Sequence, residues 1–289
     1  MTNQVIEDIS LAEQSNEISH VIGIMSGKGG VGKSLVTGLL AVALRKAGYS
    51  VGILDADITG PSIPKMFGLT SRPEMSELGI FPIETPSGIR VISINLLLDS
   101  PDSPVIWRGP MISNTVTQFW KDVFWGKLDY LLVDLPPGTS DVPLTVMQSL
   151  PINGVVVVTS PQDLAAMVVR KAVNMCTQMK VPILGLVQNM AYMKCPGCAD
   201  VIYPFGNTNG QSVADQMGIP YLLDMPIDPE ISARSDAGTI EGYGDNMLVD
   251  KVDLITSGLK VVSHAKNHSC CGGGKRNTGE CNEGDCCCK

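Results

Sequence analysis

Short, continuous apolar runs recur along the chain and alternate with stretches of helical periodicity. The runs lie at residues 20–25, 51–54, 130–133, 155–158 and 183–187. Strands that are covered on both faces are typically apolar throughout rather than at every second residue. Alternation of such strands with helices, one of which is expected over residues 35–46, predicts a doubly wound, mostly parallel sheet of the α/β class.

Two regions depart from this alternation. Residues 80–83 and 89–94 are rich in apolar side chains and flank a Pro-Ser-Gly turn, which predicts a β-hairpin. Between residues 246 and 264, apolar side chains recur at 4-3-4-3 spacing, which predicts a helix with one apolar stripe packed on the domain. The stripe consists of Leu248, Val252, Ile255, Leu259 and Val262.

The pattern divides the chain into three segments. Residues 1–18 lack strong periodicity and are predicted to be a short polar lead. Residues 19–264 carry the strand–helix alternation and are predicted to be one α/β domain. Residues 265–289 are a Gly- and Cys-rich tail of low complexity that cannot form a core, so we expect this tail to be disordered.

Composition and charge exclude several classes of protein. Of the 289 residues, 44% are hydrophobic, which is enough for a folded core. The net charge of -8 argues against sequence-independent binding of nucleic acid. No apolar stretch approaches the roughly 20 residues that cross a bilayer, and the N-terminus lacks a signal-peptide pattern, so we expect a cytoplasmic protein without a membrane partner. With only His20, His264 and His268, most histidine acid–base chemistry is disfavoured.

The first apolar run leads directly into a phosphate-binding loop. Residues 27–34 have the sequence GKGGVGKS and fit the pattern G-x-x-x-x-G-K-[ST]. The glycines allow backbone N–H groups to surround phosphate oxygens, and the following helix directs its positive N-terminus at them. Lys33 is expected to reach the β- and γ-phosphates, and the Ser34 hydroxyl to bind Mg²⁺. The nucleotide-binding residues predicted in this loop are Gly27, Lys28, Gly29, Gly30, Val31, Gly32, Lys33 and Ser34.

Residues at the ends of two other strands complete the predicted phosphate chemistry. Asp134 ends the run LLVD, in the position that holds Mg²⁺ in P-loop NTPases. Gly138, a few residues later, is expected to donate its N–H to the γ-phosphate. Asp57 is placed to orient the attacking water or a Mg²⁺-bound water, whereas Asp55 is expected to cap a turn or the start of a helix.

One amide side chain is predicted to contact the base of the nucleotide. Asn189 ends the run ILGLVQN, at the edge where α/β sheets bind ligands. A side-chain amide can pair with both N6 and N7 of adenine. The chain also lacks an N-K-x-D guanine motif, so the predicted nucleotide is ATP rather than GTP.

The nine cysteines are unevenly distributed, with six of them in the tail. Cys176 lies on a predicted helix and is expected to be a small buried hydrophobic residue. Cys195 and Cys198 form a C-x-x-C pair, which supplies two thiolates although a tetrahedral site or a cubane cluster needs four. A thioredoxin-type redox pair does not fit the surrounding sequence. A zinc site completed by other cysteines, a structural zinc knuckle and a site shared across a two-fold axis are all compatible with the pair.

Lys28 adds a second lysine to the phosphate-binding loop, which then resembles the deviant Walker A motif KGGxGK of MinD-like ATPases. This resemblance implies that Lys28 contacts the nucleotide across a dimer. Further segments resemble, in the same order, the Mrp/ApbC family of iron–sulfur cluster carrier ATPases over residues 19–264. They are DADITGPS (55–62), WRGPM (107–111), DLPPGTSD (134–141), QNM followed by CPGC, and PIDP (226–229).

The resemblance to Mrp/ApbC proteins implies both a cargo and a switch. Cys195 and Cys198 would hold a 4Fe–4S cluster that bridges a homodimer, and apo iron–sulfur proteins would receive the cluster. Slow ATP hydrolysis would act as the switch, with Lys28, Lys33 and Asp57 as catalytic residues. Ser34 and Asp134 would lie at the Mg²⁺. The chain departs from the eukaryotic scaffold of the family because it has no cysteine before Cys176.

A MinD- or ParA-like positioning ATPase with a structural zinc knuckle is the main alternative. A MinD-like membrane tether requires a C-terminal amphipathic helix with basic and bulky residues, and a ParA-like protein requires a basic DNA-facing patch. Residues 248–262 contain no aromatic residue and carry mixed charge, and the whole chain is acidic. The C-x-x-C pair therefore favours the carrier. An ATP-dependent ligase for small molecules is neither supported nor excluded by these motifs.

Overall fold

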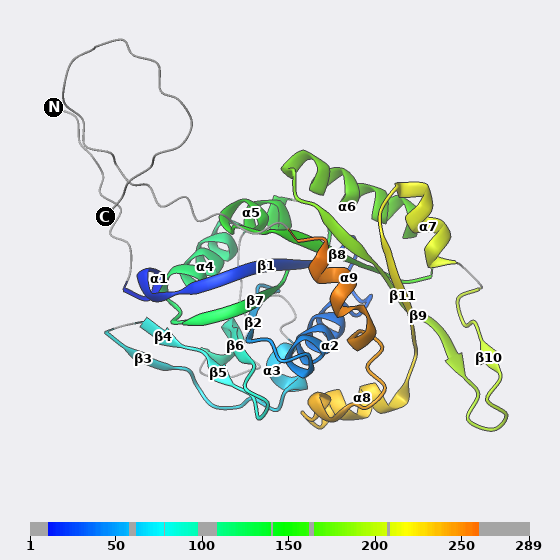
Figure 1. The fold of residues 1–289 in the computed structure, drawn as a ribbon, viewed down its shortest axis with the longest axis horizontal. Helices are drawn as coiled ribbons and strands as arrows, with labels where there is room; N and C mark the ends of the chain where they lie inside the picture. Colours follow the sequence, from blue (N-terminus) through cyan, green and yellow to red (C-terminus); the bar gives the residue numbers. More distant parts are fainter. Residues whose placement is uncertain are drawn as a thin grey trace, which may run out of the picture.

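The computed structural model describes residues 11–57, 62–77, 79–97, 109–139, 141–161, 165–206 and 209–259. Strands in these ranges that form the central sheet are β1 (Glu17–Ser26), β2 (Val51–Asp55), β5 (Ile83–Glu84), β6 (Arg90–Ser93), β7 (Lys127–Asp134), β8 (Gly154–Thr159), β9 (Ile183–Lys194), β10 (Val201–Ile202) and β11 (Tyr221–Pro226). Their order is β10-β9-β8-β1-β7-β2-β6-β5, with β11 also paired to β9 (Figure 1). Neighbouring strands are parallel, except that β5 is antiparallel to β6 and β10 to β9.

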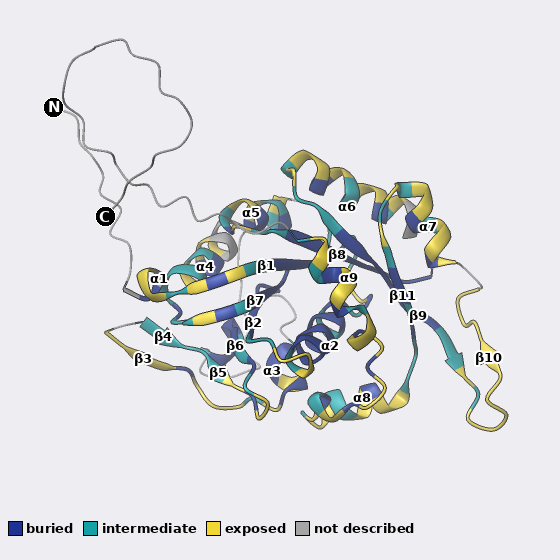
Figure 2. Cartoon of the chain, in the orientation of Figure 1, coloured by how far each residue is buried: buried dark blue, intermediate teal, exposed yellow. Residues whose placement is uncertain are grey.

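Helices cover both faces of this sheet, as the predicted doubly wound fold requires (Figure 1). One face is packed by α2 (Lys33–Lys46), α3 (Ile63–Met66), α8 (Pro229–Asp236), α9 (Val252–Ser257) and the 3-10 turns η2 (Ile240–Gly242) and η3 (Val249–Lys251). The other face is packed by α4 (Gly109–Asp122), α5 (Asp141–Ser149), α6 (Ala165–Met179) and α7 (Gly210–Met217), with α1 (Leu11–Ser15) beside α4. Each face has its own apolar core. Most of the covering helices expose their outer surfaces, whereas α2 is buried on all sides from Val36 to Leu44 (Figure 2).

The five apolar runs predicted as strands all form strands, and the helix predicted over residues 35–46 is α2. Two of the strands are longer than predicted. β1 begins at Glu17 and follows α1, so folded structure starts within the segment predicted to be a polar lead. β9 continues past Val187 to Lys194 and ends immediately before Cys195. The C-x-x-C pair is therefore attached directly to a strand of the central sheet.

The predicted hairpin is only partly correct. β5 and β6 flank the Pro-Ser-Gly turn and pair antiparallel. Residues 80 and 81, however, belong to β4 (Gly79–Phe81), which pairs with β3 (Glu74–Ser76) in a separate two-stranded sheet. Pro82 separates β4 from β5, because a proline cannot donate a ladder hydrogen bond. The 3-10 turn η1 (Ile94–Leu96) follows β6.

The length predicted for the helix over residues 246–264 is wrong, because α9 spans only Val252–Ser257. α9 ends at Ser257, before Gly258, a residue of low helix propensity. Leu248, Val252 and Ile255 are nevertheless buried, as their apolar spacing predicted. Val262 and the tail over residues 265–289, with its predicted disorder, lie outside the described residues. None of the helices in the described ranges has the length and apolarity needed to span a membrane.

Candidate functional site

Four strands bring their carboxyl ends to one edge of the sheet, where the predicted site residues meet. The phosphate-binding loop, residues 27–34, connects β1 to α2, and Asp57 follows β2. Asp134 is the last residue of β7, where it lies opposite Asp55 of β2. Asn189 lies on β9 at the same edge. Because parallel sheets bind ligands at this edge, the topology gathers the predicted nucleotide site in the expected place.

The backbone of the phosphate-binding loop forms an open cradle. Gly30 and Gly32 have φ angles of 78° and 82°, in the left-handed region that favours glycine. A Cβ at Gly29 or Gly30 would meet no atom within 4 Å, whereas a Cβ at Gly32 would lie 2.1 Å from the amide nitrogen of Asn189. The cavity above the loop has a volume of about 400 Å³ and is also lined by Asp57. The loop is therefore closed on its inner side and open on the side where phosphates would bind.

Lys33 is buried between two carboxylates at the floor of this cavity. Its Nζ lies 2.7 Å from Asp134 Oδ1 and 3.3 Å from Asp57 Oδ2. Ser34 Oγ donates a hydrogen bond of 2.5 Å to Asp134 Oδ2, and Thr37 Oγ1 donates one of 2.9 Å to Asp134 Oδ1. Burial acts to lower the pKa of Lys33, but the charges of Asp134 and Asp57 outweigh it and the pKa is raised. Lys33 is therefore a fixed cation.

Asp55 caps a turn, as expected, but it is also fully buried beside the cavity. Its Oδ1 accepts a hydrogen bond of 3.2 Å from the Asp57 N–H, and its Oδ2 accepts one of 2.9 Å from Ser93 Oγ. Burial and the neighbouring charge of Asp134 raise the pKa of Asp55 well above its ordinary value. Burial therefore acts against the charged form of Asp55, whereas the charge of Lys33 and the hydrogen bond from Ser93 act in its favour.

The donor set of the cavity fits Mg²⁺. Ser34, Asp57 and Asp134 supply a hydroxyl and carboxylates, and Mg²⁺ prefers such hard oxygen ligands. Two other predicted residues contribute less directly. The Gly138 N–H donates to the Ser26 carbonyl oxygen at 2.9 Å, so its predicted contact with the γ-phosphate requires that bond to break. Lys28 is half-buried in the loop, and its contact across a dimer stays a prediction.

Asn189 lies directly beneath the phosphate-binding loop rather than in an open base-binding pocket. Its side chain is buried, and its Nδ2 donates a hydrogen bond of 2.9 Å to the Val31 carbonyl oxygen. Its Oδ1 is buried without a hydrogen-bond partner among the described residues. Asn189 therefore fixes the loop with one end of its amide, while the other end retains an unused acceptor. Its contact with adenine stays a prediction.

Replacement of Asn189 by alanine is expected to weaken ATP binding about tenfold, because loss of one buried hydrogen bond costs roughly 1–2 kcal/mol. Titration calorimetry measures the dissociation constant for ATP, and urea unfolding checks that the variant folds. Asn174→Ala, on the exposed surface of α6, is the matched control and is expected to bind ATP as the unmodified chain does. An unchanged dissociation constant for Asn189→Ala would show that the Val31 contact does not support the loop.

The Cys195–Cys198 pair lies in the turn between β9 and β10, at the exposed end of the sheet (Figure 1). Backbone hydrogen bonds from Cys195 N to Asp200 O and from Ala199 N to Cys195 O, of 2.8 and 2.9 Å, close the turn. Hydrogen bonds from the backbone of Gly197 and Cys198 lower the pKa of Cys195 and favour its thiolate. The Asp200 carboxylate, 3.1 Å from Cys198 Sγ, raises the pKa of Cys198. Both thiols are free.

Among the described residues, the structure gives this turn two sulfur atoms but no complete metal site. Thiolates that accept backbone N–H groups are oriented for a metal, as supporting hydrogen bonds orient metal ligands generally. Within the described part of the chain, no group of three or more His, Cys, Asp or Glu side chains could hold a metal ion. Cys176, by contrast, is a buried hydrophobic residue, as predicted, and burial raises its pKa to about 11. The turn therefore presents two free thiols, and their predicted role as ligands of a metal or cluster stays a prediction.

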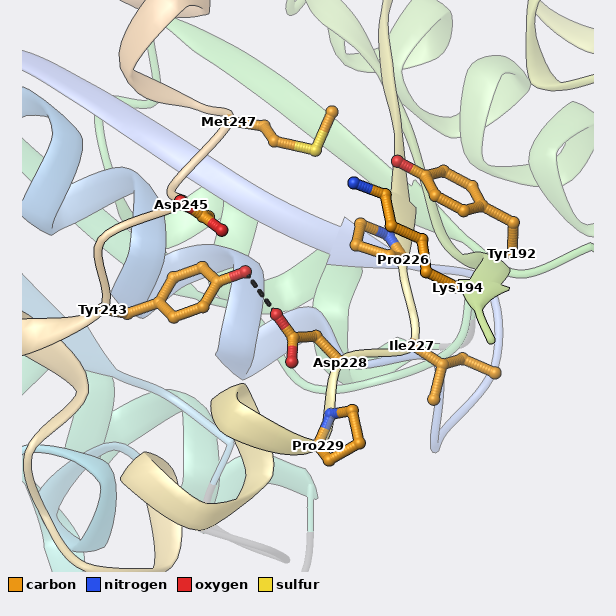
Figure 3. A pocket seen from close by; sticks show the side chains of 9 residues that line it. All are labelled: Tyr192, Lys194, Pro226, Ile227, Asp228, Pro229, Tyr243, Asp245 and Met247. Atoms are coloured by element: carbon orange, nitrogen blue, oxygen red, sulfur yellow. Dashed lines mark hydrogen bonds between the residues drawn. The ribbon is translucent and has the colours of Figure 1, made fainter. Parts of the chain in front are cut away.

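A second cavity, which the sequence did not predict, opens along β9 at the same edge of the sheet (Figure 3). Its volume is about 380 Å³. One wall comes from the end of β9, and the others come from the end of β11 and from the segment between η2 and η3. The lining residues are Tyr192, Lys194, Pro226, Ile227, Asp228, Pro229, Tyr243, Asp245 and Met247.

Comparisons with known proteins agree with this geometry. The family model described as ParA: NUBPL iron-transfer P-loop NTPase matches residues 17–258. An iron-sulfur cluster carrier protein of Clostridium perfringens is 45% identical over 258 residues, which cover 86% of this chain and 89% of the relative. The cytosolic Fe-S cluster assembly factor CFD1 of Kluyveromyces lactis is 42% identical over 265 residues, which cover 89% of this chain and 92% of the relative.

A solved structure is similar to this chain in both sequence and fold. The nucleotide-binding protein of Archaeoglobus fulgidus in complex with ADP has 46% sequence identity and a TM-score of 0.73, covering 80% of this chain and 91% of the other. The residues matched by the family model, 17–258, include the phosphate-binding loop, the aspartates and the cysteine turn described above. On the strength of sequence and fold together, this chain belongs to the family of NUBPL-type iron-transfer P-loop NTPases.

Proposed function

We propose that this chain binds a 4Fe–4S cluster between two copies of itself and transfers it to apo iron–sulfur proteins under the control of ATP. The observation that carries the proposal is the pair of free thiols at the end of β9, Cys195 half-buried and Cys198 exposed, because the same strand contacts the phosphate-binding loop through Asn189. One strand thus joins the nucleotide-binding element to a metal-binding turn. Family membership favours this cargo over the role of a MinD- or ParA-like positioning ATPase.

Ligand count favours a site shared by two copies. A cubane cluster takes about four thiolates, and each copy supplies Cys195 and Cys198. A two-fold axis beside the turn would bring the four thiolates together. Exposed apolar side chains adjoin the thiols and would be covered in such a dimer. These side chains belong to Val201, Ile202, Tyr203 and Phe205.

Hydrolysis is assigned to the phosphate-binding loop and its aspartates. Lys33 would bind the β- and γ-phosphates, Asp57 would orient the attacking water, and Lys28 would contact the nucleotide of the other copy. Mg²⁺, held through Ser34 and Asp134, supplies charge neutralisation when it is bound. Slow hydrolysis then acts as a switch between two states of the carrier rather than as a metabolic reaction.

The cavity along β9 is where we place the adenine base and ribose. Tyr192 is the third residue after Asn189 on the strand, a distance of about 10 Å that a nucleotide bound at the loop can span. Pro226 and Ile227 give the cavity apolar walls, and hydroxyl and charged groups lie around them. This arrangement supports ATP as the nucleotide.

The partners of the carrier follow from its cargo. Apo iron–sulfur proteins are proposed as the acceptors, and the cytoplasm as the location, in line with the names of the relatives. The net charge of -8 disfavours nucleic acid as a partner. No role at a membrane is proposed.

Replacement of Asp57 by asparagine is expected to lower ATP hydrolysis about 100-fold, because the side chain that orients the attacking water is lost. ATP binding is expected to persist, since the 2.7 Å contact between Lys33 and Asp134 remains. Phosphate release and titration calorimetry measure the two quantities. Asp236→Asn, at an exposed surface pair with Lys65, serves as the control and should hydrolyse ATP normally. Normal hydrolysis by Asp57→Asn would remove Asp57 from the mechanism.

Cluster transfer to an acceptor tests the proposed function. The chain is loaded anaerobically with iron and sulfide and mixed with an apo enzyme whose activity requires a 4Fe–4S cluster. The proposal predicts that acceptor activity returns as the cluster absorbance of the carrier declines, at a rate that Mg-ATP changes. A chain that takes up no cluster, or one that keeps its cluster in the presence of the acceptor with and without ATP, would contradict the proposal.

A further inference from the structure

β9 connects three functional elements in one short stretch of chain. Asn189 donates its hydrogen bond to Val31 of the phosphate-binding loop, Tyr192 and Lys194 line the cavity in Figure 3, and Cys195 follows directly. From Asn189 to Cys195 the chain advances by six residues, about 20 Å of strand. A change at the loop or in the cavity can therefore reach the thiols through one continuous strand.

This strand is irregular between the loop and the cavity. Met190 has a φ of 60°, a left-handed conformation that is uncommon for a residue with a side chain. The pairing with β11 shifts register in the same place, where Asp224 lies opposite Gln188 but Pro226 lies opposite Tyr192. Bulges of this kind re-aim side chains and are common beside functional sites. Here the bulge lies immediately after the residue that holds the loop.

Lys194 is the cation of the cavity and the residue next to Cys195. Figure 3 shows its side chain turned along the cavity toward Met247, beside the hydroxyl of Tyr192. Asp228, on another wall, has both oxygens engaged, by the Tyr243 hydroxyl at 2.7 Å and the Glu230 N–H at 2.8 Å. Among the described residues, the Lys194 ammonium forms no ion pair or hydrogen bond. Its donors are therefore open to a ligand in the cavity.

We propose that Lys194 is a positioning residue that couples nucleotide in this cavity to the cluster at Cys195 and Cys198. The inference rests on the proposed function and names the residue through which the two sites communicate. A nucleotide whose base and ribose occupy the cavity offers acceptors to the Lys194 ammonium and fixes it there. Without nucleotide, the ammonium is able to turn toward the adjacent turn that carries the thiols.

Two physical effects link the position of Lys194 to the cluster. Lys194 is bonded to Cys195, whose N–H closes the turn on Asp200 O at 2.8 Å, so displacement of one shifts the other. A 4Fe–4S cluster held by thiolates also carries net negative charge, and the free energy of holding it depends on the distance to a nearby cation. Coupling between two binding sites is reciprocal, so a cluster at the thiols changes nucleotide affinity by the same factor.

The experiment measures this coupling factor in the full chain. Titration calorimetry under anaerobic conditions gives the dissociation constant for a non-hydrolysable ATP analogue with the cluster absent and with the cluster loaded. The same ratio is measured for Lys194→Gln, which removes the charge, and for Lys194→Arg, which keeps it. Lys171→Gln, an exposed lysine on α6, is the matched control. The urea midpoint of each variant verifies that the fold is unchanged.

The unmodified chain and the Lys171→Gln control are expected to show a factor in the usual allosteric range, about 5- to 150-fold. Lys194→Gln is expected to reduce the factor to less than about twofold, and Lys194→Arg to restore most of it. The coupling role would be overturned if the coupling factor of Lys194→Gln equalled that of the unmodified chain. It would also be overturned if the cluster left the nucleotide dissociation constant of the unmodified chain unchanged while both sites still bind. A chain that binds no cluster, in contrast, would overturn the proposed function itself.

Discussion

Replacement of Lys33 by alanine is expected to abolish ATP binding while cluster binding through Cys195 survives. The Lys33 ammonium is the buried cation between Asp57 and Asp134, so its loss leaves two carboxylates facing the phosphates without compensation. In a bound complex, truncating one partner of a buried charged pair costs about 2–5 kcal/mol of binding free energy, which corresponds to a loss of about 30-fold to several thousandfold in affinity. Titration calorimetry measures ATP binding, and iron analysis after reconstitution measures the cluster.

Lys28→Ala is the matched comparison, because it removes a lysine from the same loop. Lys28 is half-buried and is predicted to contact the nucleotide of the other copy. A single copy of Lys28→Ala should therefore still bind ATP within about fivefold of the normal affinity. Its hydrolysis of ATP should be lost. Normal ATP affinity in Lys33→Ala would contradict the assignment of the phosphate site. Loss of the cluster from a folded Lys33→Ala protein would show that cluster binding at Cys195 and Cys198 depends on the phosphate-binding site.

Replacement of Cys195 and Cys198 by alanine is expected to remove the bridging cluster and any dimer that depends on it. The two thiols are the accessible cysteines of the described residues, since Cys176 is fully buried. ATP binding is expected to remain, because the turn lies outside the cavity above the phosphate-binding loop. Sedimentation of the reconstituted chain ending at His264, with and without the two substitutions, measures the dimer.

Cys176→Ala provides the control for the removal of a thiol. Its side chain is 0% exposed and packs on Met25, so the expected effect is a loss of about 1 kcal/mol in the free energy of unfolding, with the cluster retained. A dimer that forms equally well in the doubly substituted chain would contradict a cluster held between the two copies. Loss of the cluster from a folded Cys176→Ala protein would contradict the assignment of the ligands.

The nucleotide site was largely predictable because its chemistry is local in sequence. The phosphate-binding loop needs glycines, a lysine and a hydroxyl within eight residues. In the structure, Lys33, Ser34 and Asp57 line one cavity, and Asp134 lies buried beneath it in contact with Lys33 and Ser34. The parallel sheet followed from continuous apolar runs, since strands covered on both faces are typically apolar throughout, whereas the order of the strands comes from the structure alone. The contact of Thr37 with Asp134 was not predicted. Thr37 lies one helical turn after Lys33 on α2, and this spacing indicates that the two side chains share a face of the helix.

Features that depend on contacts between distant segments were not predictable. The hydrogen bond from Asn189 to Val31 joins residues 158 positions apart, and no local pattern indicates it. The buried state of Asp55 depends on its neighbours Ser93 and Asp134 from other strands. The extension of β9 to Lys194 passes through polar residues and the left-handed Met190, which break the apolar run that marks its first half. The cavity along β9 arises from three separate segments.

Metal analysis after anaerobic reconstitution with iron and sulfide tests the central claim most directly. Three proteins are compared: the full chain, the chain ending at His264, and that shorter chain with Cys195→Ala and Cys198→Ala. A bridging cluster predicts about four irons and four sulfides per dimer in the shorter chain, and none once the two cysteines are removed. Zinc in place of iron, or no metal at all, in the shorter chain would contradict the bridging cluster. The chain would then be better described as a nucleotide-dependent switch in which the two cysteines have a structural role.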